Sequence, residues 1–347
     1  MEGEHIKTYP LLLPLAWIYG LVVFIRNLLF DIGILPQRSY DVPVINIGNI
    51  TVGGTGKTPH TEYLIRLLET HWQVAVLSRG YKRKTKGFQL ADADTDMQQI
   101  GDEPYQMKQK FPHIHMAVDG NRCRGIAKLM QASVMPPVDV ILLDDAYQHR
   151  YVRPDINILL IDYNRPIYMD HLMPAGRLRE QTSGTSRADI IIITKCPRRI
   201  TPIEKRGIER TLALKSYQKV FFTTLRYQQS MPSFERAPLL VTGIASGKQM
   251  ADDMRQYYPD LTLLAFPDHH YFSRKEIADI EMQAAGRPII TTEKDSPRLS
   301  SLPHTVIPVE VEFLGDDAER FNKIIKDYVH KNSRNSSLHK GKNGDKP

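Results

Sequence analysis

A glycine-rich run ending in Gly56-Lys57-Thr58 constrains the fold of this chain more than any other feature. An apolar run at 42–47 precedes it and a helical pattern at 58–69 follows it, which predicts a strand, a turn and a helix. Backbone N–H groups in such a turn surround phosphate oxygens only where no Cβ obstructs them, and the helix dipole adds to the attraction. The run therefore predicts a P-loop, although Thr51 stands in place of its usual first glycine. A strained turn that binds nothing is the alternative interpretation.

The P-loop hypothesis assigns a role to each residue of the turn. Lys57 is expected to neutralise charge on the β- and γ-phosphates, and Thr58 to ligate Mg²⁺. The residues expected to hold the nucleotide are Thr51, Val52, Gly53, Gly54, Thr55, Gly56, Lys57 and Thr58.

A second apolar run, 140–143, ends in Asp144 and Asp145. In P-loop proteins a carboxylate at such a strand end holds Mg²⁺, usually through water. A solvated turn or a helix cap is the alternative for two adjacent acids. Together with the P-loop, the pair favours a metal site.

The order of apolar runs predicts an α/β fold of the P-loop NTPase type. These runs are nearly continuous in apolar residues, as expected of mostly parallel strands covered on both faces. They occupy 42–47, 74–77, 138–143, 156–161 and 190–194, and the rhythm restarts at 239–243, 261–266, 289–291 and 306–311. A polar stretch, 227–237, separates the two series, and 347 residues suit two domains better than one. The predicted domains are an apolar N-terminal helix (1–35), a P-loop domain (36–227), a smaller α/β domain (228–330) that ends in a helix at 316–328, and a disordered basic tail (331–347).

The N-terminal segment favours membrane association. No charge lies between Tyr9 and Ile25, and a helix of this length rises about 26 Å, short of the ~30 Å hydrocarbon core. Pro10 and Pro14 shorten it further, so an interfacial helix fits better than a span. A buried helix capping a soluble core is the alternative.

The overall charge indicates an anionic partner. A net charge of +7 and a pI near 9.2 leave nucleic acid, an anionic membrane surface and a phosphorylated substrate open. Five of the eight residues at 79–86 are cationic. The simplest interpretation of this segment is a solvated loop, and the alternative is a loop that binds an anionic acceptor or lipid headgroups. Cys123 and Cys196 provide neither a disulfide framework nor a metal site, which favours a reducing cytoplasm.

Several polar motifs are weak when taken singly. Gly101-Asp102-Glu103-Pro104 marks a probable helix start, where carboxylates are favoured by the dipole alone. Asp268-His269-His270 follows a predicted strand, and a His-His pair more often lies on a solvated surface than in a catalytic site. Arg79, Asn121, Arg122 and Arg177 are candidates for contacts with an anionic substrate.

Taken in order, the motifs resemble the tetraacyldisaccharide 4′-kinase family of lipid A biosynthesis. The resemblance covers nearly the whole chain except the basic tail. It rests on the apolar N-terminus, Gly-Asn-Ile-Thr-Val-Gly-Gly-Thr-Gly-Lys-Thr-Pro at 48–59, Ser-Arg-Gly-Tyr at 78–81, Gly-Asp-Glu-Pro at 101–104, Leu-Asp-Asp-Ala-Tyr-Gln-His at 143–149, Leu-Met-Pro-Ala-Gly-Arg-Leu-Arg-Glu at 172–180, Phe-Pro-Asp-His-His at 266–270 and Thr-Glu-Lys-Asp at 292–295.

The resemblance implies a specific reaction. Kinases of this family transfer the γ-phosphoryl group of ATP to the 4′-hydroxyl of a tetraacylated disaccharide 1-phosphate, at the cytoplasmic face of the bacterial inner membrane. Asp102 then looks like the base, with His269 as its partner, and Glu103, Asp144 and Asp145 look like groups around Mg²⁺. The implied partners are an acylated disaccharide phosphate lipid and an anionic membrane surface, and not nucleic acid. Because Lys57 and His269 lie in different predicted domains, closure of the two domains is expected to assemble the site.

Two rival hypotheses keep parts of this interpretation. One is a membrane-associated P-loop NTPase without a lipid acceptor, which predicts turnover without lipid. The other is a membrane-bound adaptor with a degenerate nucleotide fold. Thr51 motivates the adaptor, and the intact Lys57, Thr58 and Asp144 speak against it.

Overall fold

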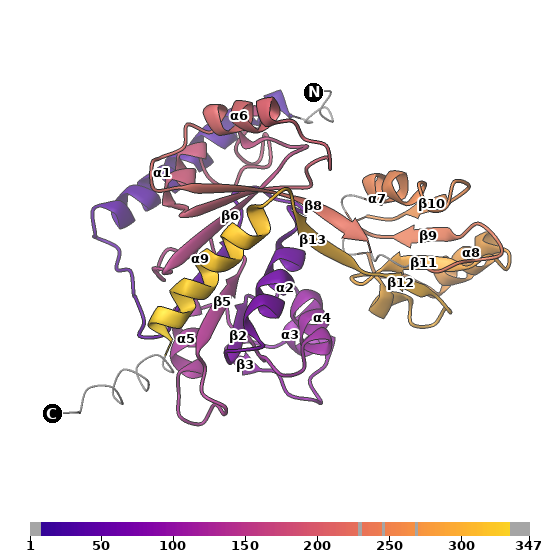
Figure 1. Ribbon diagram of the computed structural model, residues 1–347, viewed down its shortest axis with the longest axis horizontal. Coiled ribbons are helices and arrows are strands. Elements are labelled where there is room, and N and C mark those ends of the chain that lie inside the picture. Colours follow the sequence, from indigo (N-terminus) through magenta and orange to yellow (C-terminus); the bar gives the residue numbers. More distant parts are fainter. Residues whose placement is uncertain (1–7, 228–230, 245–246, 268–269, 334–347) are drawn as a thin grey trace. The chain divides into compact units, whose positions relative to one another are not determined.

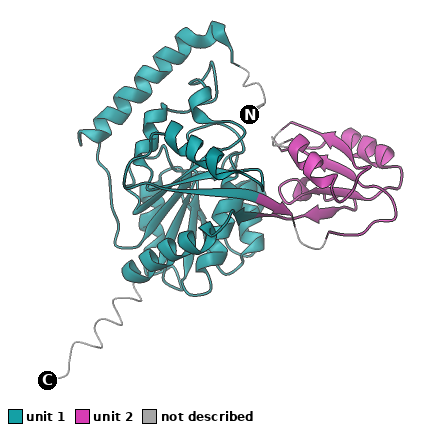
Figure 2. Ribbon diagram, turned by 45° about the horizontal axis from the view of Figure 1, so that its top comes forward, with its two compact units in different colours: residues 1–224, 311–347 teal, residues 225–310 magenta. Residues whose placement is uncertain are grey.

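The computed structural model describes residues 8–227, 231–244, 247–267 and 270–333. It contains two compact units, one formed by Met1–Thr224 with Val311–Pro347 and the other by Leu225–Glu310 (Figure 2). The first unit thus takes both the beginning and the end of the chain. The smaller unit is an insertion within it.

The first unit is built on a nine-stranded sheet in the order β13-β8-β7-β6-β1-β5-β2-β4-β3 (Figure 1). The pairs from β8 across to β4 are parallel, and β3 pairs antiparallel with β4. Its strands are β1 (Val44–Gly48), β2 (Val74–Ser78), β3 (Gln89–Leu90), β4 (His115–Val118), β5 (Val140–Asp144), β6 (Ile156–Asp162), β7 (Ile190–Thr194), β8 (Lys219–Tyr227) and β13 (Val309–Phe313). The predicted α/β fold with a mostly parallel sheet is confirmed.

Both faces of this sheet are covered, which explains why its central strands are apolar along their whole length. The helices are η1 (Pro10–Leu12), α1 (Leu13–Asp31), α2 (Lys57–Leu68), α3 (Met97–Ile100), α4 (Asp102–Lys110), α5 (Arg122–Leu129), η2 (Ile167–Met169), η3 (Thr182–Arg187), α6 (Pro202–Thr211) and α9 (Asp317–Asn332). Ile45 and Ile47 of β1 pack with α2 and α9 on one face, whereas Val44 packs with α5 on the other. Alternate residues of a strand point to opposite faces of the sheet, so the helices on one face contact Ile45 and Ile47 and the helix on the other face contacts Val44.

The C-terminal boundary of the second domain differs from the predicted 228–330. Residues 311–332 return to the first unit, where α9 runs over the sheet beside α2 (Figure 1). The reason is a buried stripe on α9 at helical spacing, Phe321, Ile325 and Val329. Phe321 packs against Phe221 of β8 and Phe313 of β13, with ring centroids 5.4 and 4.8 Å away. The helix also continues to Asn332, past the predicted start of the basic tail at 331, and residues from 334 onwards lie outside the described part of the chain.

The second unit has a four-stranded parallel sheet in the order β10-β9-β11-β12. Its elements are β9 (Leu239–Thr242), α7 (Gly247–Met254), β10 (Thr262–Ala265), α8 (Arg274–Ala284), β11 (Ile289–Thr292), η4 (Ser296–Leu299) and β12 (Thr305–Ile307). The run at 306–311, expected to form one strand, forms two strands separated by Pro308. Proline has no N–H for a ladder, so β12 ends before it and β13 begins after it, in the other sheet.

Helix α1 packs on the first unit through a narrow stripe. Its buried residues are Ala16, Gly20, Val23 and Phe30. Polar contacts fasten both halves of the helix: the Tyr19 hydroxyl donates to the Arg179 carbonyl at 2.6 Å, and Arg150 pairs with Asp31 at 2.5 Å. The predicted apolar helix is therefore present, and it lies against the folded unit.

Candidate functional site

The predicted P-loop lies at the point of the sheet where ligands are expected. Residues 49–56 connect the carboxyl end of β1 to α2, and β1 lies between β5 and β6. Chain connections diverge on the two sides of such a strand, which leaves a crevice above its carboxyl end. Gly53 has φ +119° and Gly56 has φ +85°, in the region that favours glycine, so these two residues let the backbone turn into the helix.

Internal hydrogen bonds hold the loop in this conformation. The Asn49 side-chain amide donates to the Thr55 hydroxyl at 2.7 Å, and the Thr194 hydroxyl of β7 donates to the Thr55 carbonyl at 3.0 Å. A ring nitrogen of His60, one turn into α2, lies 2.7 Å from the Gly56 carbonyl. A loop braced at both ends keeps its N–H groups in place before a ligand arrives, which lowers the cost of binding.

The same geometry explains why Thr51 replaces a glycine. Thr51 forms an antiparallel bridge with Leu178, flanked by hydrogen bonds from Val52 N to Arg177 O and from Arg179 N to Ile50 O, both 2.8 Å. Thr51 is not among the residues of positive φ, so a Cβ is tolerated there. The segment 177–180 therefore braces the P-loop like a short strand.

Lys57, Asp145 and Arg179 form a charged cluster beside the loop. The Lys57 Nζ lies 3.8 Å from Asp145 Oδ1, and Arg179 Nη1 lies 3.0 and 3.1 Å from the two Asp145 oxygens. Burial tends to raise the pKa of Asp145, but Lys57 and Arg179 outweigh it and the pKa is lowered. Asp145 is therefore held as a carboxylate between two cations.

Asp144 lies in a different environment, although it is the neighbouring residue. It is buried, with its oxygens accepting from the Ser78 hydroxyl at 3.0 Å and from the Thr61 hydroxyl at 3.4 Å. Burial, followed by the charges of Glu103 and Asp145, raises the pKa of Asp144 to about 7. A cation placed between these acids would relieve that repulsion.

Helix α4 begins with Asp102 and Glu103, and the charge of Glu103 contributes to raising the pKa of Asp144. Gly101 precedes them with φ +92°, and a Cβ there would lie 2.8 Å from the Tyr81 carbonyl. The turn before α4 thus requires glycine, which is why Gly101 stands next to the two acids. Asp102 is half-buried, and the N-cap position of α4 is occupied by Gly101 and not by a capping side chain.

The oxygen-rich donor set suits Mg²⁺. The predicted ligands Thr58, Glu103, Asp144 and Asp145 all offer oxygen, which hard cations prefer. Across the described ranges, no group of three or more His, Cys, Asp or Glu is gathered tightly enough to hold an ion by itself. Mg²⁺ usually keeps several waters and binds through one or two carboxylates and substrate phosphates, so these residues fit the ion together with a nucleotide.

The four candidate substrate residues have different surroundings. Arg177 is exposed and reaches the P-loop, because its Nη1 lies 3.8 Å from where a Cβ of Gly53 would be. Arg79 is exposed as well. Asn121 caps α5 by accepting from Arg124 N at 3.1 Å.

Arg122 is buried and donates to two backbone carbonyls, those of Asp119 at 3.0 Å and Asp144 at 3.3 Å. Burial lowers the pKa of Arg122 to about 10. These contacts place Arg122 directly behind the two acids, where it supports the turn after β5. A direct contact of Arg122 or Asn121 with substrate stays a prediction.

His269 lies outside the described residues, so its partnership with Asp102 also stays a prediction. The following residue, His270, has a ring nitrogen 2.9 Å from Glu276 Oε1 and stacks on Phe266 with centroids 5.1 Å apart. These contacts occupy His270 within its own unit.

Sequence reasoning missed the residues that brace the site. Glu180 is fully buried and accepts from Gln148 and Arg187, both at 2.8 Å, while Gln148 also donates to the Asn49 carbonyl at 2.8 Å. Gln148 lies 99 positions from Asn49 in the sequence, and the fold brings the two together. Gln148 and Glu180 do fall within the motifs at 143–149 and 172–180, but those motifs do not indicate a bracing role.

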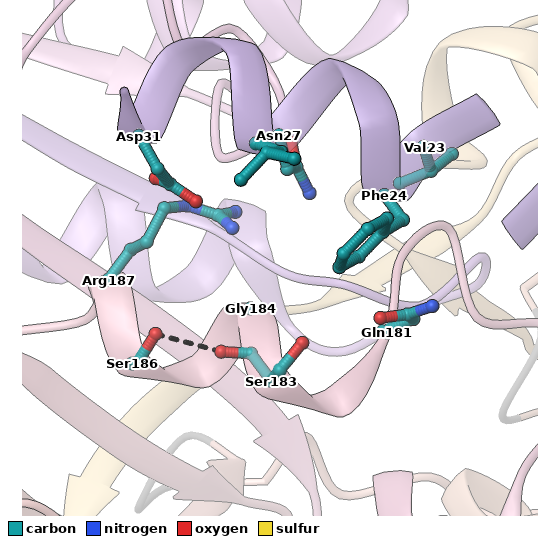
Figure 3. A pocket seen from close by; sticks show the side chains of 10 residues that line it. Val23, Phe24, Asn27, Asp31, Gln181, Ser183, Gly184, Ser186 and Arg187 are labelled. Carbon is teal, nitrogen blue, oxygen red and sulfur yellow. Dashed lines mark hydrogen bonds between the residues drawn. The ribbon is translucent and has the colours of Figure 1, made fainter. Parts of the chain in front are cut away.

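The outer face of α1 is apolar and exposed. In the described part of the chain one helix, Pro10–Asp31, is long and apolar enough to cross a membrane, with a mean hydropathy of 1.8. Trp17 is 72% exposed, and Ile18, Leu21 and Val22 are each about 60% exposed. A groove of about 160 Å³ runs between α1 and residues 181–187 (Figure 3). Phe24 and Asn27 line its upper wall and Ser183 and Ser186 its lower wall, and no P-loop residue lines it.

Comparison with known proteins decides the family. The model of the family described as Tetraacyldisaccharide-1-P 4′-kinase matches residues 8–330. This chain belongs to that family. The resemblance drawn from its motifs is thus confirmed.

Relatives within this kinase family match over nearly their whole length. A tetraacyldisaccharide 4′-kinase of Phocaeicola vulgatus is 52% identical, covering 97% of this chain and 100% of the relative. One of Bacteroides thetaiotaomicron is 45% identical, covering 99% of each. The crystal structure of the "apo" form of LpxK from Aquifex aeolicus in complex with ATP has a TM-score of 0.70 and 29% sequence identity, covering 91% of this chain and 97% of that one. The fold, with its P-loop, is therefore that of the 4′-kinase family.

Proposed function

We propose that this chain transfers the γ-phosphoryl group of ATP to the 4′-hydroxyl of a tetraacyldisaccharide 1-phosphate. Family membership over residues 8–330 and the ATP complex of the Aquifex relative support this function. The observation that carries this proposal is the charged cluster at the P-loop. There Lys57, the first residue of α2, lies 3.8 Å from Asp145. A cation and a metal-binding acid at the end of a phosphate cradle suit phosphoryl transfer.

The reaction requires a bond exchange at phosphorus. The acceptor hydroxyl oxygen forms a bond to the γ-phosphorus, the bond from that phosphorus to the bridging oxygen of ADP breaks, and the hydroxyl proton leaves. Lys57 offsets the charge that develops on the phosphoryl oxygens and on ADP. Mg²⁺, when bound by Thr58, Asp144, Asp145 and Glu103, supplies further charge neutralisation.

Asp102 is proposed as the base that receives this proton, with His269 as its partner. A sugar hydroxyl has a pKa far above 7, so a positioned carboxylate assists as the proton leaves. Asp102 begins α4, next to Glu103, whose charge reaches Asp144. The proposed base thus belongs to the same helix as a proposed metal ligand.

The lipid acceptor and the apolar face of α1 both support an enzyme that acts at a membrane surface. The exposed apolar face of α1 is suited to the headgroup and acyl boundary, with its polar residues fastened to the folded unit. We propose that the chain associates peripherally with the cytoplasmic face of the inner membrane, with anionic lipids attracting its net charge of +7.

Transfer of labelled γ-phosphate tests the proposal. Wild-type protein with Mg²⁺ and ATP should move the label to a lipid-extractable product only when the disaccharide acceptor is present in detergent. Asp102→Asn should lower kcat strongly and change the KM for ATP little, because the base acts after ATP has bound. Release of the label as free phosphate without acceptor would instead identify an NTPase, and tight ATP binding without turnover would identify an adaptor.

A further inference from the structure

We infer that Glu62 is a positioning residue, which clamps α4 to α2 so that Asp102 faces the phosphate end of α2. The inference rests on the proposed function, since Asp102 is the base of that reaction. The geometry points to it independently of any bound ligand.

Glu62 is a buried carboxylate that bridges two helices. Its side chain is 2% exposed on α2, and its Oε2 lies 2.6 Å from the Nζ of Lys110, the last residue of α4. The Gln106 amide of α4 donates to Glu62 Oε1 at 3.1 Å. Arg66, on α2 itself, lies 3.5 Å from Oε2. The carboxylate therefore contacts α4 through both of its oxygens.

These contacts fall on regular ridges of the two helices. Residues four apart stack on one face of a helix. On α2 this row is Thr58, Glu62 and Arg66, and on α4 it is Asp102, Gln106 and Lys110. Glu62 engages Gln106 and Lys110, and Arg66, one turn further along α2, lies over the Phe111 ring just beyond α4, so the two rows lie side by side and run in the same direction. Asp102 begins the row on α4, and Thr58 begins the row on α2.

Apolar packing also holds α4: Tyr105 lies against the main core, and Phe111, the C-cap residue, is buried in that core. Only Pro104 and Met107 of its nine residues are buried. A helix turns by about 100° per residue, so a slip of one residue would carry Asp102 to another face. Apolar packing tolerates such a rotation better than a carboxylate held by two directed donors does. The clamp therefore adds directed polar contacts that favour one rotation of α4 over its neighbours.

The clamp explains a buried charge that otherwise carries a cost. Removing a carboxylate from water is unfavourable, and a buried ion pair often adds little to stability relative to apolar residues of the same size. Glu62 connects the helix that begins with Lys57 and Thr58 to the helix that begins with Asp102. A misplacement of about 1 Å between reacting groups is enough to reduce a rate strongly.

Arg66 provides a matched control for the experiment. Lys110→Met and Arg66→Met each remove one cation from the same carboxylate, but only Lys110 belongs to α4. We expect Lys110→Met to lower kcat for acceptor phosphorylation by about tenfold or more, with the KM for ATP within about twofold. Arg66→Met removes the contact of Arg66 with the Phe111 ring at the C-cap of α4, 5.4 Å away, but it leaves the bridge from Glu62 to Gln106 and Lys110 intact, so kcat should stay within about threefold of wild type. Lys110→Arg should restore most of the kcat, since the guanidinium can still reach Glu62.

Two further measurements separate positioning from general stability. Urea midpoints of Lys110→Met and Arg66→Met should be similar, so a difference in kcat between them does not arise from unfolding. In a double-mutant cycle, Glu62→Gln and Lys110→Met should be non-additive in log kcat, whereas Glu62→Gln and Arg66→Met should be closer to additive.

The outcomes also separate this inference from the proposed function. Wild-type protein that phosphorylates no acceptor overturns the proposed function. Active wild type with an unchanged kcat in Lys110→Met, or an equal loss in Arg66→Met, overturns the clamp alone. If Glu62→Gln fails to fold, the Lys110 and Arg66 variants still decide between the two results.

Discussion

Neighbouring residues in this site acquire different chemistry from their surroundings. Asp144 and Asp145 are adjacent, yet Asp144 is buried beside Ser78 and another acid, and its pKa rises to about 7, whereas Lys57 and Arg179 hold the pKa of Asp145 low. Asp145, the residue after β5, adopts φ +50°. One strand end thus carries one carboxyl whose pKa is raised and a neighbour whose pKa is lowered.

Lys57→Ala should abolish most of the catalytic rate. Lys57 is proposed to neutralise charge on the transferring group, and loss of such a charge contact costs about 3–4 kcal/mol of transition-state stabilisation, or about 10²–10³ in kcat. Single-turnover transfer to the acceptor measures it. Lys82→Ala, an exposed cation in the basic loop, is the matched control and should retain activity. A near-normal kcat for Lys57→Ala would contradict its assigned role.

His60 should make the protein less stable in mild acid. Burial lowers the pKa of His60 to about 4, against about 6.5 in the unfolded chain. Between these values only the unfolded state binds the proton, so the free energy of unfolding falls as the pH falls from about 6.5 to about 4. The full loss is about 3 kcal/mol.

Urea unfolding of wild type and His60→Gln at pH 7.5 and 4.5 measures this contribution. The variant cannot take up this proton, so it should lose about 2 kcal/mol less than wild type between the two values. Identical pH dependence in both proteins would show that His60 does not titrate as its buried position implies.

At the scale of elements, much of the fold was readable from the sequence because its signals are local. The strands β1, β2, β5, β6 and β7 coincide with continuous apolar runs, and α2 begins at Lys57, one residue before the predicted 58–69. Strands β4 and β8 were missed, because one is short and the other mixes polar residues into its run. The division at Pro308 was missed too, since only pairing with two different sheets reveals it.

The site was predicted less completely than the fold, for a related reason. Lys57, Asp144 and Asp145 were identified because each lies at the end of a recognisable element. The bracing by Arg179 and Glu180 depends on contacts with the P-loop, Gln148 and α1, which join positions far apart in the chain. Pairings of this kind leave no periodic pattern in one sequence.

The proposed interfacial position of α1 predicts how its two faces respond to charge. Trp17→Glu places a carboxylate on a site that is 72% exposed, so the free energy of unfolding should change by less than about 0.5 kcal/mol. Sedimentation with anionic vesicles should nevertheless fall, because the carboxylate opposes insertion. Ala16→Glu, at a buried position of the same helix, should instead destabilise the fold. Unchanged vesicle binding of Trp17→Glu would remove α1 as the membrane contact.

At the scale of the whole molecule, the chain leaves the first unit along β8 and returns along β13, which lies next to β8 in the nine-stranded sheet. The segment after the insertion is essential to the first core. Phe321, Ile325 and Val329 of α9 belong to the same apolar cluster as Ile45 and Ile47 of β1.

Phe321→Ala should therefore destabilise the first unit, although it lies near the end of the described chain. A fully buried phenylalanine truncated to alanine costs about 3–5 kcal/mol. Hydrogen exchange should show the loss in amides of β1 and β8. Met282→Ala, which is 72% exposed on α8, is the control and should change exchange little. Protection of β1 equal to wild type in Phe321→Ala would show that α9 is dispensable.

The insertion also has a consequence during synthesis on the ribosome. The first unit is started early, but the part of its sheet that α9 covers stays exposed until residues 317–332 have emerged, after the whole of Leu225–Glu310. The inserted unit, Leu225–Glu310, can therefore finish folding before the first unit does. Until then Phe221 lacks its α9 partner, and the nascent chain carries an open apolar surface of the kind that chaperones bind.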